Sequence, residues 1–305
     1  MSSKYSTVEI EGHDLRLSNL DKVLYPSVGF TKGQVIDYYV RMAPAILPYL
    51  QGRPLTLKRY PGGVEESFFY EKRCPSHRPD WMPTASVYSE GNKDYVNFCV
   101  VESVAGLVWV ANLASLELHT LLSRQDDIDR PTMMVFDLDP GEPAGLVQCA
   151  QVALDVRKLL GELKLQSWAK TSGGKGLHLY VPLNTPVAFD QTKGFARAVA
   201  AHLEATEPSR VTSNMRKELR KGKVFVDWSQ NDDHKTTCCT YSLRARQRPT
   251  VSTPLTWEEI ETLAGGGDAS AVSFEAADAA NRVNALGDLF APVLTKKQKL
   301  AQFPR

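Results

Sequence analysis

The stretch Met133-Met134-Val135-Phe136-Asp137-Leu138-Asp139 places two aspartates at the end of an apolar run. A second run, Val224-Phe225-Val226-Asp227-Trp228, also leads into an acidic residue. Short runs of apolar β-forming residues are typical of buried strands. Because side chains alternate along a strand, Asp137 and Asp139 share one face while Leu138 turns to the other.

These neighbouring carboxylates predict a metal centre. Two carboxylates at the end of a buried strand repel each other and are costly to remove from water. A divalent cation relieves both penalties, and Asp227 from a second strand would complete the set of ligands. Three aspartates around two metal ions are how enzymes carry out in-line displacement at phosphorus. The two runs therefore predict chemistry at phosphorus.

Size and composition allow a large core. The chain has 305 residues, of which 43% are hydrophobic and 23% charged. This length suits one large domain or two interlocked ones. No apolar run approaches the roughly 20 residues that span a bilayer, and the first residues lack the apolar core of a secretory signal. We therefore expect a soluble, intracellular protein with no membrane partner.

Apolar periodicity predicts strands and helices without strict β-α-β alternation, and hence an α+β fold with largely antiparallel or mixed sheets flanked by helices. The expected strands are 8–10, 15–17, 55–60, 67–72, 85–89, 95–101, 116–120, 133–139, 167–170, 176–181 and 224–228. Helices are expected to begin at Thr31 and Ser103 and to cover residues around 152–163, 191–204 and, as a short basic helix, 213–220. Pro44 and Pro48 should kink or end the first helix early.

We expect the chain to form a single catalytic unit of two lobes over residues 1–305. Its core would run from about residue 17 to about 254. Residues 255–305 would form a helical C-terminal extension.

The five cysteines are odd in number and scattered: Cys74, Cys99, Cys149, Cys238 and Cys239. Without a secretory signal, this pattern favours free thiols in a reducing compartment. The alternative is a structural zinc held by Cys74 and His77 together with Cys238-Cys239. Adjacent cysteines rarely chelate one ion well, so free thiols are the preferred interpretation.

Basic residues are clustered although the net charge is only +1. The clusters lie at 58–59, 216–223 and 244–248. Charge runs are usually solvated surface, but the second cluster leads directly into the Asp227 strand. Positive charge beside a carboxylate–metal centre suits a polyanionic substrate.

A glycine-rich stretch, Thr171-Ser172-Gly173-Gly174-Lys175-Gly176-Leu177-His178, is the second informative segment. Glycines let backbone N–H groups approach an anion, while Ser172 offers a hydroxyl and Lys175 a charge. His178 falls on the same side of the next strand as Gly176. The Walker pattern is absent, and a turn of this kind alone is more often a simple hairpin. Its combination with the three aspartates favours phosphate binding.

Three blocks, Asp137–Gly141, Ser172–His178 and Lys223–Asn231, resemble in order the signature blocks of a known family. This is the archaeo-eukaryotic primase superfamily, in the branch that contains the polymerase domain of bacterial ligase D from non-homologous end joining. The resemblance extends from about Leu17 to about Pro254. It includes Asp21–Pro26, Gly52–Pro54, Phe68–Lys72 and Tyr241–Arg244.

The resemblance implies a role for each matching position. Asp137, Asp139 and Asp227 would hold two divalent ions, Mn²⁺ or Mg²⁺. The triphosphate and sugar of an incoming NTP or dNTP would be gripped by Ser172, Lys175, Gly176, His178 and Arg244, with His119, Gln230 and Lys58 close by. On the DNA side, Phe68 and Phe69 would stack on template bases, Lys22 and Lys32 would read a 5′-phosphate, and Arg220 would contact the strand.

The implied activity is template-directed nucleotidyl transfer by a primase-polymerase that prefers ribonucleotides. Its substrate would be DNA with gaps or breaks, and its partners an ATP-dependent DNA ligase and Ku. A prokaryotic, cytoplasmic and nucleoid-associated location follows from this role. The Lys-x-Asp-Gly adenylation motif is absent, so we expect a stand-alone polymerase or a part of a longer chain.

Two rival interpretations belong to other classes. A non-catalytic DNA-end-binding module could recruit a ligase, but all three acidic positions are intact. Asp-Leu-Asp could also be the metal motif of a glycosyltransferase or of an aspartyl phosphatase. Neither of these explains Asp227 or the Lys175–His178 segment.

Overall fold

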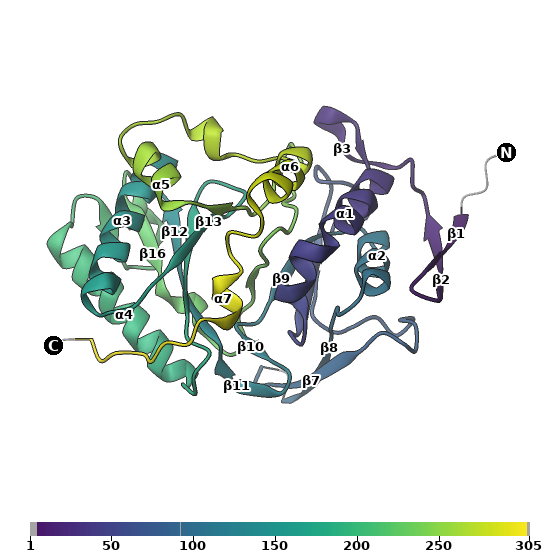
Figure 1. Ribbon diagram of the computed structural model, residues 1–305, viewed down its shortest axis with the longest axis horizontal. Helices are drawn as coiled ribbons and strands as arrows, with labels where there is room; N and C mark the ends of the chain where they lie inside the picture. The colour runs from purple at the N-terminus through teal and green to yellow at the C-terminus, as the bar shows by residue number, and fades with distance from the viewer. Residues whose placement is uncertain (1–4, 92, 304–305) are drawn as a thin grey trace. The chain divides into compact units, whose positions relative to one another are not determined.

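The computed structural model describes residues 5–91 and 93–303. Strands and helices follow one another irregularly (Figure 1), which confirms the expected α+β fold. Most strand pairs in the described residues are antiparallel, and β15 pairs with β16 in parallel. The chain divides into two compact units. Unit 1 comprises Met1–Leu121, Cys238–Val251 and Glu275–Ala285, and unit 2 comprises Leu122–Thr237, Ser252–Phe274 and Leu286–Arg305. Among the described residues, no helix has the length and apolarity needed to cross a membrane.

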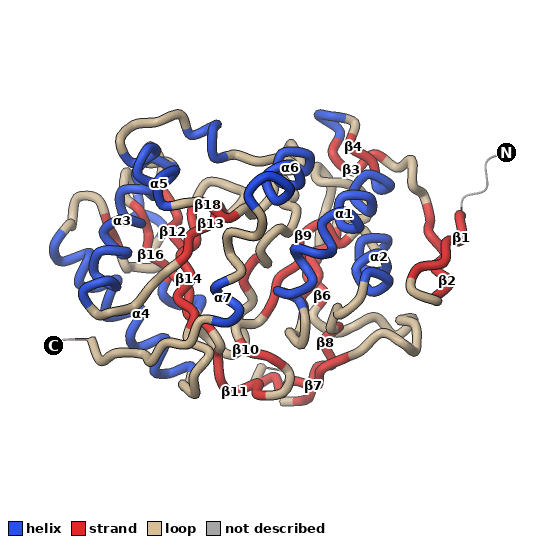
Figure 2. The backbone as a smooth tube through the Cα atoms, in the orientation of Figure 1, coloured by secondary structure: helices blue, strands red, loops and turns tan. Residues whose placement is uncertain are grey.

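Unit 1 is built on a sheet with the strand order β17-β9-β5-β8-β7, and β6 also pairs with β5. The strands are β5 (Leu55–Arg59), β6 (Phe69–Glu71), β7 (Thr84–Ser89), β8 (Asp94–Cys99), β9 (Ser115–Thr120) and β17 (Thr237–Cys238). Two helices pack side by side (Figure 2), α1 (Lys32–Leu50) and α2 (Val104–Asn112). The N-terminal hairpins are β1 (Tyr5–Ile10) with β2 (His13–Ser18), and β3 (Val23–Tyr25) with β4 (Phe30–Thr31); a 3-10 turn, η1 (Pro26–Val28), separates β3 from β4.

Helix α1 begins at the predicted N-cap, Thr31. The Thr31 hydroxyl accepts the Gln34 N–H at 3.3 Å, and the Gln34 side chain accepts the Thr31 N–H at 2.7 Å, which is a reciprocal capping box. Of the two expected effects of Pro44 and Pro48, an early end of the helix is wrong, because the helix runs through both, and a kink stays a prediction. Neither proline is buried, so the carbonyl groups that lose a hydrogen bond to a proline nitrogen lie on the less buried side of the helix. The opposite side carries buried apolar residues, which hold the helix against the rest of unit 1.

Unit 2 holds a sheet with the strand order β15-β16-β12-β14-β13-β18. The strands are β12 (Met133–Pro140), β13 (Trp168–Thr171), β14 (Leu177–Pro182), β15 (Val211–Thr212), β16 (Val224–Asp227) and β18 (Pro254–Leu255). Helices α3 (Leu146–Glu162) and α4 (Phe189–Thr206) both contact β12, and α5 (Trp257–Ala264) packs on α3 (Figure 1).

The two faces of this sheet differ in character. Met134, Phe136 and Leu138 of β12 point into the hydrophobic core beneath the helices, together with alternate residues of β14 and β16. The odd-numbered positions of β12 therefore occupy the opposite face, because a strand alternates sides at each residue. Asp137 and Asp139 are on that opposite face, as the sequence predicts.

The remaining elements are short. They are the hairpin β10 (Ser123–Arg124) and β11 (Asp127–Pro131), the 3-10 turns η2 (Lys217–Arg220), η3 (Trp228–Gln230) and η4 (Ala269–Val272), and the helices α6 (Ala276–Leu286) and α7 (Pro292–Thr295). The predicted basic helix over 213–220 is wrong for residues 213–216, and only the 3-10 turn η2 forms at its end. Side chains take up backbone N–H groups there: Thr212 accepts the Asn214 N–H at 3.1 Å, and Asn214 accepts the Arg216 N–H at 3.0 Å.

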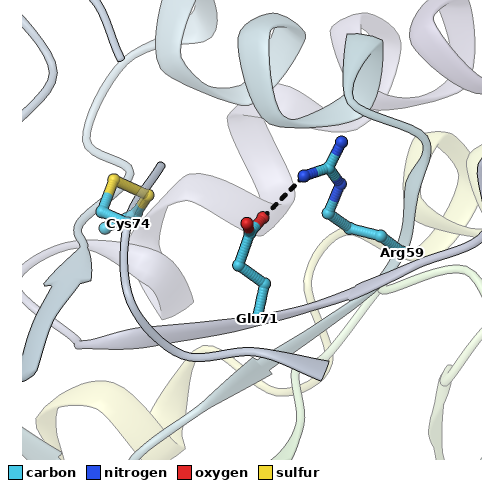
Figure 3. The surroundings of a disulfide bond; sticks show 4 residues. Arg59, Glu71 and Cys74 are labelled. Carbon is cyan, nitrogen blue, oxygen red and sulfur yellow. Dashed lines mark hydrogen bonds and ion pairs between the residues drawn. A yellow bond between two sulfur atoms is a disulfide. The ribbon is translucent and has the colours of Figure 1, made fainter. Parts of the chain in front are cut away.

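The prediction of free thiols is wrong for two of the cysteines. Cys74 and Cys99 form a disulfide that joins the segment after β6 to the end of β8 (Figure 3). The zinc alternative is excluded as well, since its proposed ligand Cys74 is bonded to another sulfur. Both β6 and β8 lie beside β5, and this proximity is not visible in the sequence spacing. Cys149, Cys238 and Cys239 lie outside this disulfide and are buried.

Candidate active site

One transverse row of the unit 2 sheet carries several of the predicted site residues. Asp137 lies opposite Asp227 of β16 on one side and opposite His178 of β14 on the other. His178 in turn lies opposite Lys170 of β13. Directly paired residues project from the same face of a sheet, and Asp139, two positions after Asp137, shares that face. The three aspartates therefore lie on one face, around the end of β12.

Asp227 is held by the turn that follows it. Its Oδ1 accepts hydrogen bonds from the Ser229 N–H at 2.9 Å and the Ser229 hydroxyl at 2.6 Å, and its Oδ2 accepts one from the Gln230 amide at 2.9 Å. The Asn231 side chain pairs with both backbone groups of Val135, at 2.8 and 2.7 Å. Asn231 thus extends the β16 ladder with its side chain while the main chain turns away after Asp227.

The donor set of the row suits divalent cations, which take carboxylate oxygens. In the described part of the chain, the one group with all its possible ligand atoms within 4.8 Å of one another is a different one, Asp232, Asp233 and His234. The Lys193 ammonium already forms an ion pair with Asp232 there. Carboxylates that share two ions, which lie about 3.5–4 Å apart, spread more widely than the ligands of one ion. Asp137, Asp139 and Asp227 are not in that group, and the described structure shows them on one face of the sheet.

The glycine-rich segment closes into a turn beside this row. The Ser172 N–H donates to the Gly176 carbonyl at 2.9 Å, and the Ser172 hydroxyl accepts the N–H groups of Gly174 and Gly176 at 3.2 Å each. Gly176 has no room for a side chain, because a Cβ would lie 2.2 Å from the Leu138 carbonyl oxygen. The turn therefore sits directly against the strand that carries Asp137 and Asp139.

Lys175 and Arg220 extend from the surroundings of the row. The Lys175 ammonium forms a solvent-exposed ion pair with Glu142 at 2.5 Å. Arg220 stacks on the Phe225 ring with its guanidinium carbon 3.7 Å from the centroid. Its loop packs on Gly141, where a Cβ would lie 1.9 Å from the Arg220 carbonyl oxygen. This contact fixes the basic loop at the end of β12.

In unit 1, three predicted nucleotide residues surround a carboxylate that the sequence analysis did not single out. Glu117 of β9 is only 1% exposed. Lys58 Nζ lies 3.3 Å from Glu117 Oε1, and His119 Nε2 and Arg244 Nε lie 2.9 and 3.2 Å from Oε2. Burial favours a high pKa for Glu117, but the hydrogen bond from His119 and the charges of Arg244 and Lys58 outweigh it and hold the pKa well below its usual range.

Arg244 reaches this cluster because its segment is docked on β9. The Ser242 hydroxyl accepts the Leu118 N–H at 2.8 Å, and the Tyr39 hydroxyl accepts the Leu243 N–H at 3.2 Å. The Tyr25 hydroxyl donates to the Arg244 carbonyl at 3.1 Å. Backbone and side chain of Arg244 are thus both fixed within unit 1.

The aromatic residues before and within β6 are exposed, which is unusual for side chains of this size. Phe68 is 48% exposed and Phe69 44%. The Lys58 ammonium lies 4.3 Å from the Phe68 ring centroid, and the Arg59 guanidinium 5.1 Å from that of Phe69. Arg59 also binds Glu71 at 2.8 Å (Figure 3). Rings backed by cations in this way offer flat faces for stacking.

Lys22 and Lys32 are brought together by the β3/β4 hairpin, through a backbone hydrogen bond of 2.8 Å from the Lys32 N–H to the Lys22 carbonyl. The buried Lys32 ammonium donates to the Ser18 carbonyl at 2.7 Å. Burial, with smaller contributions from the charges of Lys22 and Arg59, lowers the pKa of Lys32 to about 8. An anion bound between the two lysines would relieve their mutual repulsion.

The predicted site residues are thus divided between the units. Unit 2 contains Asp137, Asp139, Ser172, Lys175, Gly176, His178, Arg220, Asp227 and Gln230, and unit 1 contains Lys22, Lys32, Lys58, Phe68, Phe69, His119 and Arg244. Sequence reasoning missed Glu117 and the fully buried Lys170. Glu117 precedes His119 by two positions on a predicted strand, so the period-two pattern was a signal that could have identified it.

Comparison with known proteins identifies the family to which the chain belongs. A family model described as the LigD primase-polymerase domain matches residues 31–290. The multifunctional non-homologous end joining protein LigD of Mycolicibacterium smegmatis is 44% identical over 92% of this chain and 36% of its own length. The bifunctional LigD of Bacillus subtilis is 31% identical over 81% of this chain and 40% of its own length. The chain thus spans well under half of these relatives.

A solved structure gives the same result for the fold. The polymerase domain of Mycobacterium tuberculosis ligase D in complex with DNA superimposes with a TM-score of 0.85 and 39% sequence identity. The match covers 93% of this chain and 99% of that domain. The chain therefore belongs to the family of LigD primase-polymerase domains, which makes it a nucleotidyltransferase of the primase-polymerase type.

Proposed function

We propose that this protein is a template-directed polymerase that fills short gaps or break ends in DNA, with a preference for ribonucleotides. The observation that carries the proposal is the register that sets Asp137 opposite Asp227, with Asp139 on the same face and the glycine turn alongside. The relatives are named as non-homologous end joining proteins, and the solved relative is bound to DNA. Both facts support a role in DNA repair.

Asp137, Asp139 and Asp227 are the proposed ligands of two divalent ions, Mn²⁺ or Mg²⁺. When bound, such ions lower the pKa of a primer 3′-hydroxyl and stabilise charge on the leaving pyrophosphate. Ser229 and Gln230 fix the orientation of Asp227 through the hydrogen bonds described above. The protein's part is to hold these oxygens in place before substrate arrives.

The residues proposed to bind the incoming nucleotide are given for each unit by itself. In unit 2, hydroxyl, ammonium, backbone, ring and amide groups are supplied by Ser172, Lys175, Gly176, His178 and Gln230. In unit 1, positive charge and an imidazole are supplied by Lys58, His119 and Arg244. Lys175 is free to exchange its exposed Glu142 partner for a phosphate, because such ion pairs are weak in water. The guanidinium of Arg244 suits phosphate oxygens, which it can bind bidentately.

DNA is the proposed ligand of the exposed residues. Phe68 and Phe69 stack on template bases irrespective of sequence, since every base has a flat face. Lys22 and Lys32 bind the 5′-phosphate of the downstream strand, at the positive end of helix α1. Arg220 contacts the DNA backbone from its loop beside β12. An ATP-dependent ligase and Ku are the proposed protein partners, by analogy with the relatives' names.

The test is primer extension on a gapped duplex, comparing NTP with dNTP, Mn²⁺ with Mg²⁺, and a 5′-phosphate with a 5′-hydroxyl. We expect Asp137→Asn and Asp227→Asn to abolish extension while gap binding persists. Asp233→Asn, in the competing acidic cluster, is the matched control and should extend normally. If Asp137→Asn extended like the wild type, the metal assignment would be rejected. A wild-type protein that binds gaps but never extends would instead favour the non-catalytic end-binding module.

A further inference from the structure

The interior of unit 1 contains a buried carboxylate, Glu117, that is surrounded by hydrogen-bond donors. Glu117 lies opposite Lys58 in the sheet, and Lys58 lies opposite Tyr70, so the three form one transverse row. The Glu117 side chain is almost completely buried. A buried charge is costly unless its oxygens are fully used. The contacts of each oxygen therefore show what the residue does.

Both oxygens of Glu117 are used more than once. Oε1 lies near the Lys58 ammonium at 3.3 Å, the Tyr60 hydroxyl at 3.4 Å and the Ala245 N–H at 3.1 Å. Oε2 lies near His119 Nε2 and Arg244 Nε. Every one of these neighbours is a donor in this arrangement. An amide in place of the carboxylate would direct its NH₂ group at donors in either orientation, so only a carboxylate satisfies the site.

The contact with His119 selects one form of its ring. An ionised carboxylate can only accept hydrogen bonds, so the ring nitrogen that faces it, Nε2, must carry the proton. Burial lowers the pKa of His119 although Glu117 opposes this shift, so the ring is neutral at pH 7. Nδ1 is then left as a hydrogen-bond acceptor. Loss of the carboxylate would remove the constraint that fixes this tautomer.

A purely structural role does not account for these contacts. Well-packed apolar residues generally replace a buried ion pair without loss of stability, so such pairs are weak evidence for a stabilising function. Here one carboxylate contacts Lys58, His119 and Arg244, the three unit 1 residues that the proposed function assigns to the nucleotide. It also holds Lys58 beneath the Phe68 ring.

We propose that Glu117 is the positioning residue of this site: it sets the placement of Lys58 and Arg244 and fixes the His119 tautomer that accepts a hydrogen bond from a hydroxyl of the incoming ribonucleotide. Glu117 acts through these residues and does not itself touch the nucleotide. This inference rests on the proposed function. It adds that the preference for ribonucleotides depends on a buried carboxylate that contacts no substrate.

The test compares Glu117→Gln, Glu117→Asp and wild type for incorporation of ATP and dATP opposite the same template base. We expect Glu117→Gln to raise KM for ATP and to reduce the ATP-to-dATP ratio of kcat/KM by about tenfold, the effect of losing a hydrogen bond to a buried polar partner. Glu117→Asp keeps the charge and should retain part of the ratio. Glu71→Gln, which also loses a carboxylate partner of an arginine in unit 1, is the matched control and should leave the ratio unchanged.

A second readout does not depend on activity. The ¹⁵N shifts of His119, assigned by comparison with His119→Gln, should report the Nε2-protonated form in the wild type and a changed tautomer in Glu117→Gln. A Glu117→Gln protein with the wild-type tautomer and wild-type ATP-to-dATP ratio overturns the inference. So does an equal loss on both nucleotides without a tautomer change, which is the result of general disruption. If the wild type itself fails to extend primers, the proposed function fails, and the ¹⁵N shifts still decide the contact.

Discussion

Both units contain a row of charged side chains across a sheet, but the two rows differ in how their carboxylates are compensated. In unit 2, a transverse row places Asp227, Asp137, His178 and Lys170 side by side across the sheet. In unit 1, a row places Glu117, Lys58 and Tyr70 side by side. In the first row two carboxylates are neighbours, and in the second a single carboxylate is surrounded by cations.

This difference separates a carboxylate that is neutralised by neighbouring side chains from carboxylates that would be neutralised by bound cations. Glu117 has its counter-charges within unit 1, and its pKa is held low by them. The adjacent aspartates of unit 2 gain most from cations that are supplied from solution. Removing the charge of an acid should therefore lower the stability of the protein in the unit 1 row but not in the unit 2 row. The following predictions test this contrast.

The largest effect is expected for Asp139→Asn. This change should reduce primer extension at least about 10³-fold, because one carboxylate is lost where charge must be stabilised. It should not lower Tm in metal-free buffer, since it removes like-charge repulsion. The rise of Tm with added Mn²⁺ should become smaller than in the wild type. A marked fall of Tm without metal would show that the aspartates stabilise the fold by themselves.

Glu117→Ala should have the reverse profile. It leaves Lys58 and Arg244 close together without their buried counter-charge, which should cost about 3 kcal/mol of unfolding free energy in urea titrations. Glu261→Ala, which breaks an exposed pair with Arg157, is the control and should cost less than about 1 kcal/mol. Equal losses of unfolding free energy in the two variants would contradict the view that Glu117 is neutralised by side chains of unit 1.

Lys32 provides a pH test, since it is a buried lysine that binds Ser18 rather than a carboxylate. Its pKa is lowered to about 8, so the ammonium is charged below that pH and loses its proton as the pH rises. The preference for a 5′-phosphorylated gap should therefore weaken as the pH is raised above about 8. Binding titrations with Lys32→Arg should keep the preference there, because a guanidinium stays charged. The same decline in both proteins would assign it to another group.

The smallest effect is expected for Glu142→Gln. Its partner Lys175 is exposed, in contrast with the half-buried Lys58, so the carboxylate competes only weakly with a triphosphate for the ammonium. KM for NTP should fall by about two- to threefold at low salt, with kcat unchanged. The difference should vanish at about 1 M salt, where exposed charges are screened. A KM that rises would mean that Glu142 helps to place Lys175.

Much of unit 2 could be predicted from alternation alone. The runs ending at Asp139 and Asp227 gave the right strands and the right face, because a buried sheet face imposes a period of two. The caps at Thr31 and Ser103 were visible for a similar local reason. The helix does not end early at Pro44 or Pro48, because tertiary packing sustains it.

Features that depend on strand order could not be predicted. The disulfide between Cys74 and Cys99 arises because β6 and β8 both neighbour β5, and no spacing rule encodes that. The cluster around Glu117 needs residues from β5, β9 and the segment after β17. Likewise, the division of the site residues between two units became apparent only from the folded chain.

Asn231 shows how a residue that touches none of the acids can govern one of them. If the main chain of β16 had continued the hydrogen bonding beside Val135, the strand would have run straight on past Asp227. A strand rises about 3.3 Å per residue, so Ser229 and Gln230 would then lie farther along the sheet, away from the Asp227 carboxylate. Substituting this asparagine should therefore resemble damage to Asp227 itself. Variation at such a position would look like loss of an acid in an activity assay, although every carboxylate is intact.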